Sequence, residues 1–115
     1  MSQRDGRVRL RHMLDHSREA VALIAGKSLA DLYADRQLNL ALVRLLEIVG
    51  EAASRTTEEE RHLCPSIPWS QIVSLRNRLV HGYDSVDFDV LWGIVAEDIP
   101  KLIAVLETSL KGTQL

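Results

Sequence analysis

Two cations, an amide, an imidazole and a phenol fall close together in the run Arg76-Asn77-Arg78-Leu79-Val80-His81-Gly82-Tyr83. A histidine titrates near neutrality, so His81 can take a proton from a ribose 2′-hydroxyl or give one to a leaving 5′-oxygen. Arg76 keeps its charge at all relevant pH and presents a planar fork of donors that matches phosphate oxygens. Negative charge grows on those oxygens in the transition state of phosphoryl transfer, where a fixed guanidinium helps most. These residue types therefore suit the cleavage of RNA without a metal ion.

The spacing of Arg76 and His81 limits how one helix could present both side chains. Residues five apart on an unbroken α-helix diverge by roughly 140° around the axis. Two arrangements remain open: the helix ends before His81, as Gly82 permits, or groups from a second subunit complete the site. Spacing alone favours a simpler interpretation, in which Arg76 and Arg78 are solvated cations that complement a helix dipole.

The apolar residues of the chain recur with the period of a helix, and no segment alternates with the two-residue period of a strand. A first helix ends at Gly26. From about Arg36 to Ser54 the pattern leaves almost no polar face, which indicates a central helix or one shared with a second subunit. The buried stripe of the first helix is Leu10, Met13, Leu14, Val21 and Ile24, and its solvent-facing stripe is Arg9, His12, His16 and Glu19.

Two further helices complete the expected fold. Pro68 opens a third helix that Gly82 breaks, and Asp87 caps a last helix in which Pro100 predicts a kink. Capping boxes, which indicate short extra helical turns, stand at Ser28 with Asp31 and at Thr57 with Glu60. Asp35 is expected to cap the helix that begins at about Arg36. With short connections between them, these elements predict an all-α fold: an antiparallel, up-and-down four-helix bundle formed by a single domain, residues 1–115.

The net charge of −2 and the pI near 6.1 exclude a protein that coats nucleic acid indiscriminately. Aromatic residues make up 4% of the chain, too few for base-stacking platforms, so any contact with RNA should be brief and carry little sequence readout. We expect no association with a membrane, because no apolar run approaches the roughly 20 residues that a spanning helix needs. The N-terminus lacks a signal-peptide core and the single Cys64 cannot form an intrachain disulfide, so a reducing cytoplasm fits best.

Three segments in this order resemble the HepT-like proteins of the HEPN superfamily. The Arg-x-x-x-x-His-x-Tyr pattern of Arg76, His81 and Tyr83 resembles the motif of that family. The run Leu46-Glu47-Ile48-Val49-Gly50-Glu51-Ala52-Ala53 is similar to its second-helix signature, and Ile67-Pro68-Trp69 is similar to its entry to the motif helix. The resemblance covers nearly the whole chain, with no departure at the motif positions.

This resemblance implies a HEPN-type bundle that forms a homodimer and places two motif segments at the subunit interface. It implies an RNase that acts as a toxin, with Arg76 and His81 catalytic and with Asn77, beside Arg78, as a supporting polar group. It also implies a partner, a minimal nucleotidyltransferase antitoxin that inactivates the toxin by adding AMP to Tyr83. Neither a metal ion nor a cofactor is expected.

A line of charges, Arg44, Glu47 and Glu51, follows the otherwise apolar second helix at i, i+3 and i+7. Unpaired burial of these groups would be costly, so each needs a partner. Two interpretations stay open. The three side chains could pair with Arg76 or Arg78 and orient the site from behind, or they could form a structural ion-pair seam between helices.

Other polar residues favour structural interpretations. Gly50 is expected to be a close-packing position. His12 and His16 have the i, i+4 spacing of zinc ligands, but no Glu stands where a zinc-protease motif requires it, so we interpret them as solvated. Cys64 has no local base. The basic N-terminal residues are interpreted as a frayed, solvated end, and they are Arg4, Arg7, Arg9 and Arg11.

Two other functions compete with the toxin RNase. One is a catalytically silent module that presents a surface to its nucleotidyltransferase, which the ordinary net charge and scarce aromatics would suit. The other is a structural helical dimer whose motif binds a nucleotide or phosphate. Toxicity on expression that is lost on changing His81 would separate the enzyme from the silent module.

Overall fold

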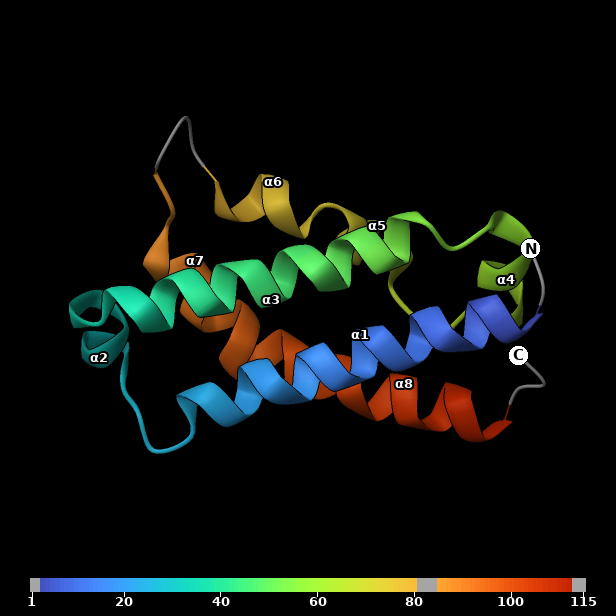
Figure 1. Cartoon of the computed structure of the whole chain (residues 1–115), viewed down its shortest axis with the longest axis horizontal. Coiled ribbons are helices and arrows are strands. Elements are labelled where there is room, and N and C mark those ends of the chain that lie inside the picture. Colours follow the sequence, from blue (N-terminus) through green and yellow to red (C-terminus); the bar gives the residue numbers. More distant parts are fainter. Residues whose placement is uncertain (1–2, 81–84, 113–115) are drawn as a thin grey trace.

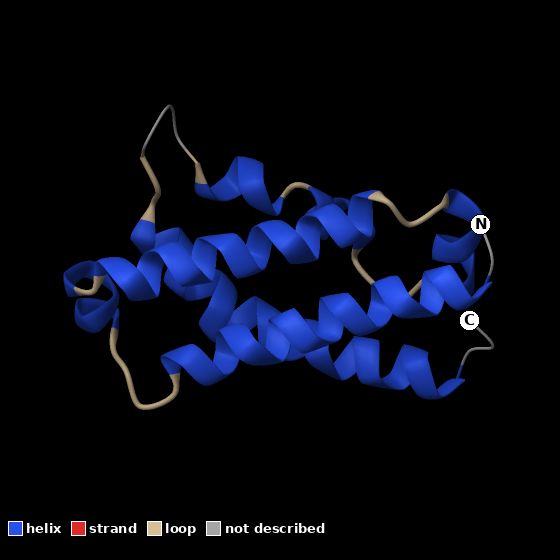
Figure 2. Cartoon of the chain, in the orientation of Figure 1, coloured by secondary structure: helices blue, strands red, loops and turns tan. Residues whose placement is uncertain are grey.

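The structure, a computed structural model of the chain, describes residues 3–80 and 85–112. Within these two ranges the elements are helices joined by short loops, together with one isolated antiparallel bridge between Val80 and Val86 (Figure 2). The all-α prediction is therefore confirmed. None of the helices in the described ranges combines the length and apolar character needed to cross a membrane.

The chain runs back and forth in passes whose directions alternate, with both ends of the described chain at the same end of the molecule (Figure 1). The first two passes are long single helices, whereas the third and the last are built from several pieces. The bounds are α1 Gln3–Ile24, α2 Leu29–Ala34, α3 Arg36–Ser54, α4 Glu58–Leu63, α5 Trp69–Val73, α6 Leu75–Leu79, α7 Phe88–Gly93, the π-helix η1 Ile94–Asp98, and α8 Ile99–Gly112. The short helices α2 and α4 lie in the connections on either side of α3.

Local sequence signals set most of the helix ends. Gly26 follows α1 with a φ of 75°, a left-handed conformation that glycine adopts at little cost. The two predicted capping boxes are both present, at the starts of α2 and α4. Asp35 caps α3 through the backbone N–H of Leu38, and Asp87 caps α7 through that of Val90. These predictions are confirmed. Each cap joins residues three apart in the chain, so the local sequence is enough to predict it.

The core is formed by one stripe of each long helix. On α3, Leu42 and Leu46 are completely buried inside the protomer, whereas Leu40 is 51% exposed. The apolar surface of this helix is thus mostly covered by its own chain, chiefly by α1. The expectation that α3 carries more apolar surface than one bundle can bury holds only for a narrow strip around Leu40.

The third predicted helix is not continuous. It is interrupted at Ser74 and ends at Leu79, three residues before the glycine that was expected to break it. In the last pass, the irregularity expected at Pro100 takes the form of η1, in which the N–H of Ile99 donates to the carbonyl of Ile94. Because Pro100 lacks an N–H and its ring crowds the preceding turn, the wider π-turn accommodates it.

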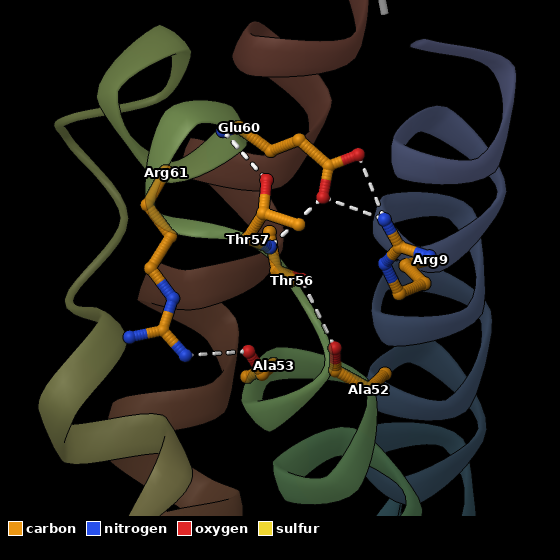
Figure 3. Close-up of polar contacts among 7 residues, drawn as sticks. All are labelled: Arg9, Ala52, Ala53, Thr56, Thr57, Glu60 and Arg61. Atoms are coloured by element: carbon orange, nitrogen blue, oxygen red, sulfur yellow. Dashed lines mark hydrogen bonds and ion pairs between the residues drawn. The ribbon is translucent and has the colours of Figure 1, made fainter. Parts of the chain in front are cut away.

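Arg9 was assigned to the solvent-facing stripe of α1, and this assignment is wrong. One nitrogen of its guanidinium donates to both carboxylate oxygens of Glu60, at 2.6 and 2.7 Å, and the two side chains are only 12% and 8% exposed (Figure 3). Glu60 also accepts from the backbone N–H of Thr57 as part of the capping box. Gly6 lies against this carboxylate, where a Cβ would collide with it. The N-terminal part of α1 is therefore fixed to α4, and the interpretation of a frayed, solvated end fails for Arg9.

Candidate active site

The helix α6 presents the polar residues of the motif on its outer side. Leu75 and Leu79 are buried and fix α6 to the core, while Arg76, Asn77 and Arg78 between them are exposed. Ser74 closes the break before α6, because its N–H donates to Ser70 and its carbonyl accepts from Arg78. The sequence places two buried leucines four residues apart, so the three polar residues between them must face outward.

The end of α6 agrees with the first of the two arrangements left open by the spacing of Arg76 and His81, a helix that ends before the histidine. The helix stops at Leu79, and Val80 is extended, with φ −98° and ψ 119°. Val80 pairs with Val86, and the N–H of Asp87 donates to the carbonyl of Leu79 at 3.1 Å. The helix thus ends before His81 in the sequence. These contacts join the described residues on the two sides of 81–84. His81, Gly82, Tyr83 and Asp84 themselves lie outside the described residues.

Arg76 makes an ion pair with Glu47 of α3. Its Nε lies 3.6 Å from Oε2 of Glu47, with side chains that are 69% and 32% exposed. The pair stands at the edge of a hollow of about 270 Å³ that is also lined by Gly50, Glu51 and Val73. Water reaches this contact, so it adds little to stability, but it places the guanidinium on the α3 side of α6.

Gly50 confirms its expected role as a close-packing position. A Cβ at Gly50 would lie 3.1 Å from the backbone carbonyl oxygen of Ile72, tighter than ordinary contact. The missing side chain allows α5 to approach α3, and this approach sets the position of Arg76 over Glu47.

Trp69 fixes the entry to the motif helix. Its Nε1 donates to the carbonyl of Cys64 at 3.1 Å, and the guanidinium of Arg61 lies 5.5 Å from its ring centre. The same guanidinium donates to the carbonyl of Ala53 at the end of α3 (Figure 3). Arg61 therefore joins the end of α3, α4 and the start of α5, a cation–π role that sequence reasoning missed.

The charged line on α3 fits neither of its two interpretations as a whole, because its residues have different partners. Glu47 reaches the motif, as the orienting interpretation requires. Glu51 instead accepts from Arg55, the residue that follows α3, at 2.9 Å, and Arg44 is exposed with no ion pair in the described part of the chain. Arg78 turns away from this group and lies 3.4 Å from Asp98 of η1. Arg76 and Arg78 thus meet carboxylates of different elements and do not converge within one protomer.

The other candidate ligands and nucleophiles carry no comparable site. His16 Nδ1 lies 2.6 Å from the carbonyl of His12, one turn earlier on the surface of α1. Among the described residues no group of three or more His, Cys, Asp or Glu side chains could hold a metal ion. Burial raises the pKa of the Cys64 thiol, against a smaller opposite effect of a hydrogen bond with Ser109. Cys64 is therefore a packing residue.

Within residues 3–80 and 85–112 the chain is helical, and it presents the exposed Arg76 on a short helix that ends two residues before His81 in the sequence. A sequence profile for the family described as "Ribonuclease HepT-like" matches residues 13–109. The chain belongs to this HepT-like family of the HEPN superfamily.

Curated relatives agree with this membership. A protein of Methanocaldococcus jannaschii named "Putative RNase" is 33% identical over 102 residues, which are 89% of this chain and 94% of that protein. A protein of Thermococcus cleftensis named "Probable ribonuclease HepT" is 42% identical over 72 residues, 63% of this chain and 66% of that protein. Another named "Putative RNase", from Caldanaerobacter subterraneus, is 33% identical over 81% of this chain and 83% of its own length. No solved structure matches the chain significantly.

Proposed function

We propose that this protein is a metal-independent endoribonuclease that acts as the toxin of a toxin–antitoxin pair. The observation that carries the proposal is the position of Arg76. It is exposed, paired with Glu47, and placed on a helix that ends at Leu79, two residues before His81 in the sequence. Membership of the HepT-like family and the names of the relatives support the same activity.

The reaction follows from the chemistry of the two side chains. A ribose 2′-oxygen attacks the adjacent phosphorus while the bond from phosphorus to the 5′-oxygen breaks. His81 takes the 2′-hydroxyl proton or supplies one to the leaving 5′-oxygen. Arg76 stabilises the charge that develops on the phosphoryl oxygens. Asn77 and Arg78 contribute polar support. The products are a 2′,3′-cyclic phosphate and a 5′-hydroxyl, and no metal ion takes part.

Residues 1–115 form a single HEPN-type domain in this proposal, and two copies form a homodimer with a composite site. The proposed contact is the motif face, defined here as the exposed residues Leu40, Arg44, Val73 and Arg76 together with the half-buried Glu47. The exposed fraction is 51% for Leu40 and 39% for Val73, which is large for two apolar side chains on the face that carries Arg76. A dimer across this face would bring two copies of Arg76 together.

The proposed partner is a minimal nucleotidyltransferase antitoxin in the same cytoplasm. It transfers AMP from ATP to the phenolic oxygen of Tyr83 and releases pyrophosphate. The modified tyrosine then carries its own phosphate into the region where RNA must bind, beside Arg76, and adds bulk there. The proposal is supported by the antiparallel bridge at the end of α6 between Val80 and Val86, described residues on either side of Tyr83 in the sequence.

The test is an RNA cleavage assay in EDTA with matched arginine variants. Arg76→Ala and His81→Ala should each lower the rate by roughly two or more orders of magnitude. Arg18→Ala is the control, since Arg18 also lies in an exposed ion pair, with Glu107 at 2.6 Å, on the α1 side of the bundle. Its rate should match that of the wild type. A wild-type protein that binds its nucleotidyltransferase and never cuts RNA would overturn the proposal in favour of a silent binding module.

A further inference from the structure

A groove lies on the other side of the motif helix, between α5 and α6 on one wall and η1 and α8 on the other. Its volume is about 230 Å³. The floor is apolar and belongs to the edge of the core, formed by Ile72, Leu75, Leu102 and Val105. The groove is thus distinct from the hollow beside Glu47, which lies on the α3 side of the same helix.

The groove adjoins the proposed active site through Arg78. This residue lines the groove and is also part of the motif, two positions after Arg76 and three before His81. The opposite wall at this end is Asp98, the last residue of the π-helix. Arg78 therefore places one end of the groove on the motif helix itself, within reach of a strand bound at the motif.

The rim of the groove carries more positive than negative charge. Arg78 and Asp98 are 3.4 Å apart and are 41% and 50% exposed, so water weakens their attraction. Lys101, one turn further along, is exposed and makes no ion pair within the described residues. Two cations and one carboxylate give a formal local charge of +1 in a protein whose net charge is −2. An anion that replaced Asp98 as the partner of Arg78 would lie in a groove that Lys101 also lines.

We propose that this groove binds the nucleotide of the RNA substrate that neighbours the scissile phosphate. Its phosphate lies between Arg78 and Lys101, and its base or ribose covers the apolar floor. The inference rests on the proposed ribonuclease function and adds a substrate subsite to it. Because the described lining is largely aliphatic and has no aromatic ring on which a base could stack, the two cations make the main contact, in keeping with a substrate recognised by its backbone.

A protein partner fits the same groove less well. Pockets that enclose drug-sized ligands usually measure about 300–1,000 Å³, so a groove of about 230 Å³ takes one nucleotide more readily than a row of side chains. Two cations beside an apolar floor match the phosphate and the flat base of a nucleotide. Docking of the nucleotidyltransferase here is therefore an outcome that the test must distinguish.

The test compares two exposed lysines of α8. Lys101→Glu changes the rim of the groove, whereas Lys111→Glu makes the same charge change in the last turn of α8 and leaves the groove intact. The probe is a fluorescein-labelled 2′-O-methyl hexaribonucleotide of mixed sequence, which has no free 2′-hydroxyl and cannot be cut. Lys101→Glu should raise its Kd at least fivefold and Lys111→Glu less than twofold. The slope of log K against log salt should shrink by about 0.7 in Lys101→Glu, the share of one phosphate contact.

Asp98→Asn should have the opposite effect on binding of the hexamer. It removes the carboxylate that competes for Arg78, so the hexamer should bind more tightly, by twofold or more. On cleavable RNA, Lys101→Glu should raise KM with kcat little changed. A structural role of the groove would not weaken binding in one variant and strengthen it in the other.

The outcomes separate the subsite from the function it rests on. Equal binding by the Lys101→Glu and Lys111→Glu proteins, with intact cleavage by the wild type, would overturn the subsite alone. Weaker binding of the nucleotidyltransferase by Lys101→Glu, with unchanged binding of the hexamer, would assign the groove to the protein partner and overturn the proposal. A wild type that neither cuts nor binds RNA would overturn the ribonuclease function itself.

Discussion

Arg76 of the motif and Glu47 of the second helix form an ion pair in which Nε and Oε2 are 3.6 Å apart. The contact is too long and too exposed to contribute much to folding stability. The contact instead fixes the position of the Arg76 side chain, because Glu47 lies on α3, which the buried Leu45 and Leu46 hold against the core. A guanidinium held in this way can meet a phosphate with less loss of side-chain freedom than an unrestrained one.

Glu47→Gln should therefore lower kcat for RNA cleavage by roughly tenfold with little change in KM, since the misplacement of a catalytic group by about 1 Å can cost as much as 10²-fold. The matched control is Glu51→Gln, because Glu51 lines the same hollow but pairs with Arg55. Steady-state kinetics on the two variants measure the difference. Equal kcat values for both would show that Glu47 does not position Arg76.

The buried pair of Arg9 and Glu60 should make the fold sensitive to acid. Burial opposes ionisation of Glu60, but hydrogen bonds from Thr57 and Arg9 outweigh it and hold the pKa of Glu60 below its usual value of 4.5. A carboxyl whose folded pKa is depressed stabilises the protein above the unfolded pKa, and this contribution is lost as pH falls through the folded pKa. As pH falls below about 4.5, the free energy of unfolding should thus fall more steeply in the wild type than in Glu60→Gln.

At pH 7 the same substitution should destabilise the protein by roughly 2 kcal/mol, because it removes a carboxylate that accepts two short hydrogen bonds from the guanidinium of Arg9 in a site that water hardly reaches. The control is Glu107→Gln, which breaks the exposed pair with Arg18 and should cost about 0.5 kcal/mol or less. Urea unfolding of the wild type, Glu60→Gln and Glu107→Gln at pH 7 measures the two losses, and the same measurement on the wild type and Glu60→Gln at acid pH measures the pH dependence. Equal losses for the two variants at pH 7 would contradict this account of Glu60.

Much of the fold could be predicted because its signals are local. The caps at Ser28, Asp35, Thr57 and Asp87 each depend on a partner within one helical turn. The partner of Arg9 could not be predicted in this way, because it lies 51 residues along the chain. Amphipathic spacing placed Arg9 toward solvent, and only the packing of α4 against α1 reveals the contact.

The candidate site shows the same division. Three polar residues between two buried leucines predict an exposed motif, and the structure has one. The partners of Arg76 and Arg78 are contributed by α3 and η1, so which carboxylate each arginine would meet depended on helix packing. The break at Ser74 has no proline or glycine to announce it. The catalytic roles of Arg76 and His81 remain predictions.

The motif face should be the dimer contact, so Leu40→Glu and Val73→Glu should each convert the dimer to a monomer with unchanged helical content. Both side chains are exposed in the protomer, and a charge there costs little unless a second copy covers it. Charged substitutions at Leu42 or Leu46, which are completely buried, should instead prevent folding.

Leu63→Glu is the control for this experiment, since Leu63 is 53% exposed on α4, away from the motif face. Sedimentation of the four proteins at micromolar concentration, with circular dichroism to check the fold, gives the answer. A wild-type monomer under these conditions would refute the proposed dimer.

Modification by the nucleotidyltransferase should fall on Tyr83 rather than Tyr33. The hydroxyl of Tyr33 already donates to Asp89 at 2.9 Å, and this hydrogen bond raises the pKa of Tyr33 and makes it a poorer nucleophile. Intact mass after co-expression should show a gain of one or more AMP units that disappears in Tyr83→Phe and persists in Tyr33→Phe. Silencing of the toxin without a mass gain, or with the gain mapped to Tyr33, would reject the proposed control.

The chemical identity of the RNA ends made in excess EDTA tests the ribonuclease mechanism most directly. Mass spectrometry of the products from the wild-type protein should find 2′,3′-cyclic phosphates and 5′-hydroxyls, and the His81→Ala protein should leave the RNA intact. Products that end in a 3′-hydroxyl with a 5′-phosphate, or cleavage that stops in EDTA and returns with Mg²⁺ or Mn²⁺, would contradict an Arg76 and His81 site that works without metal.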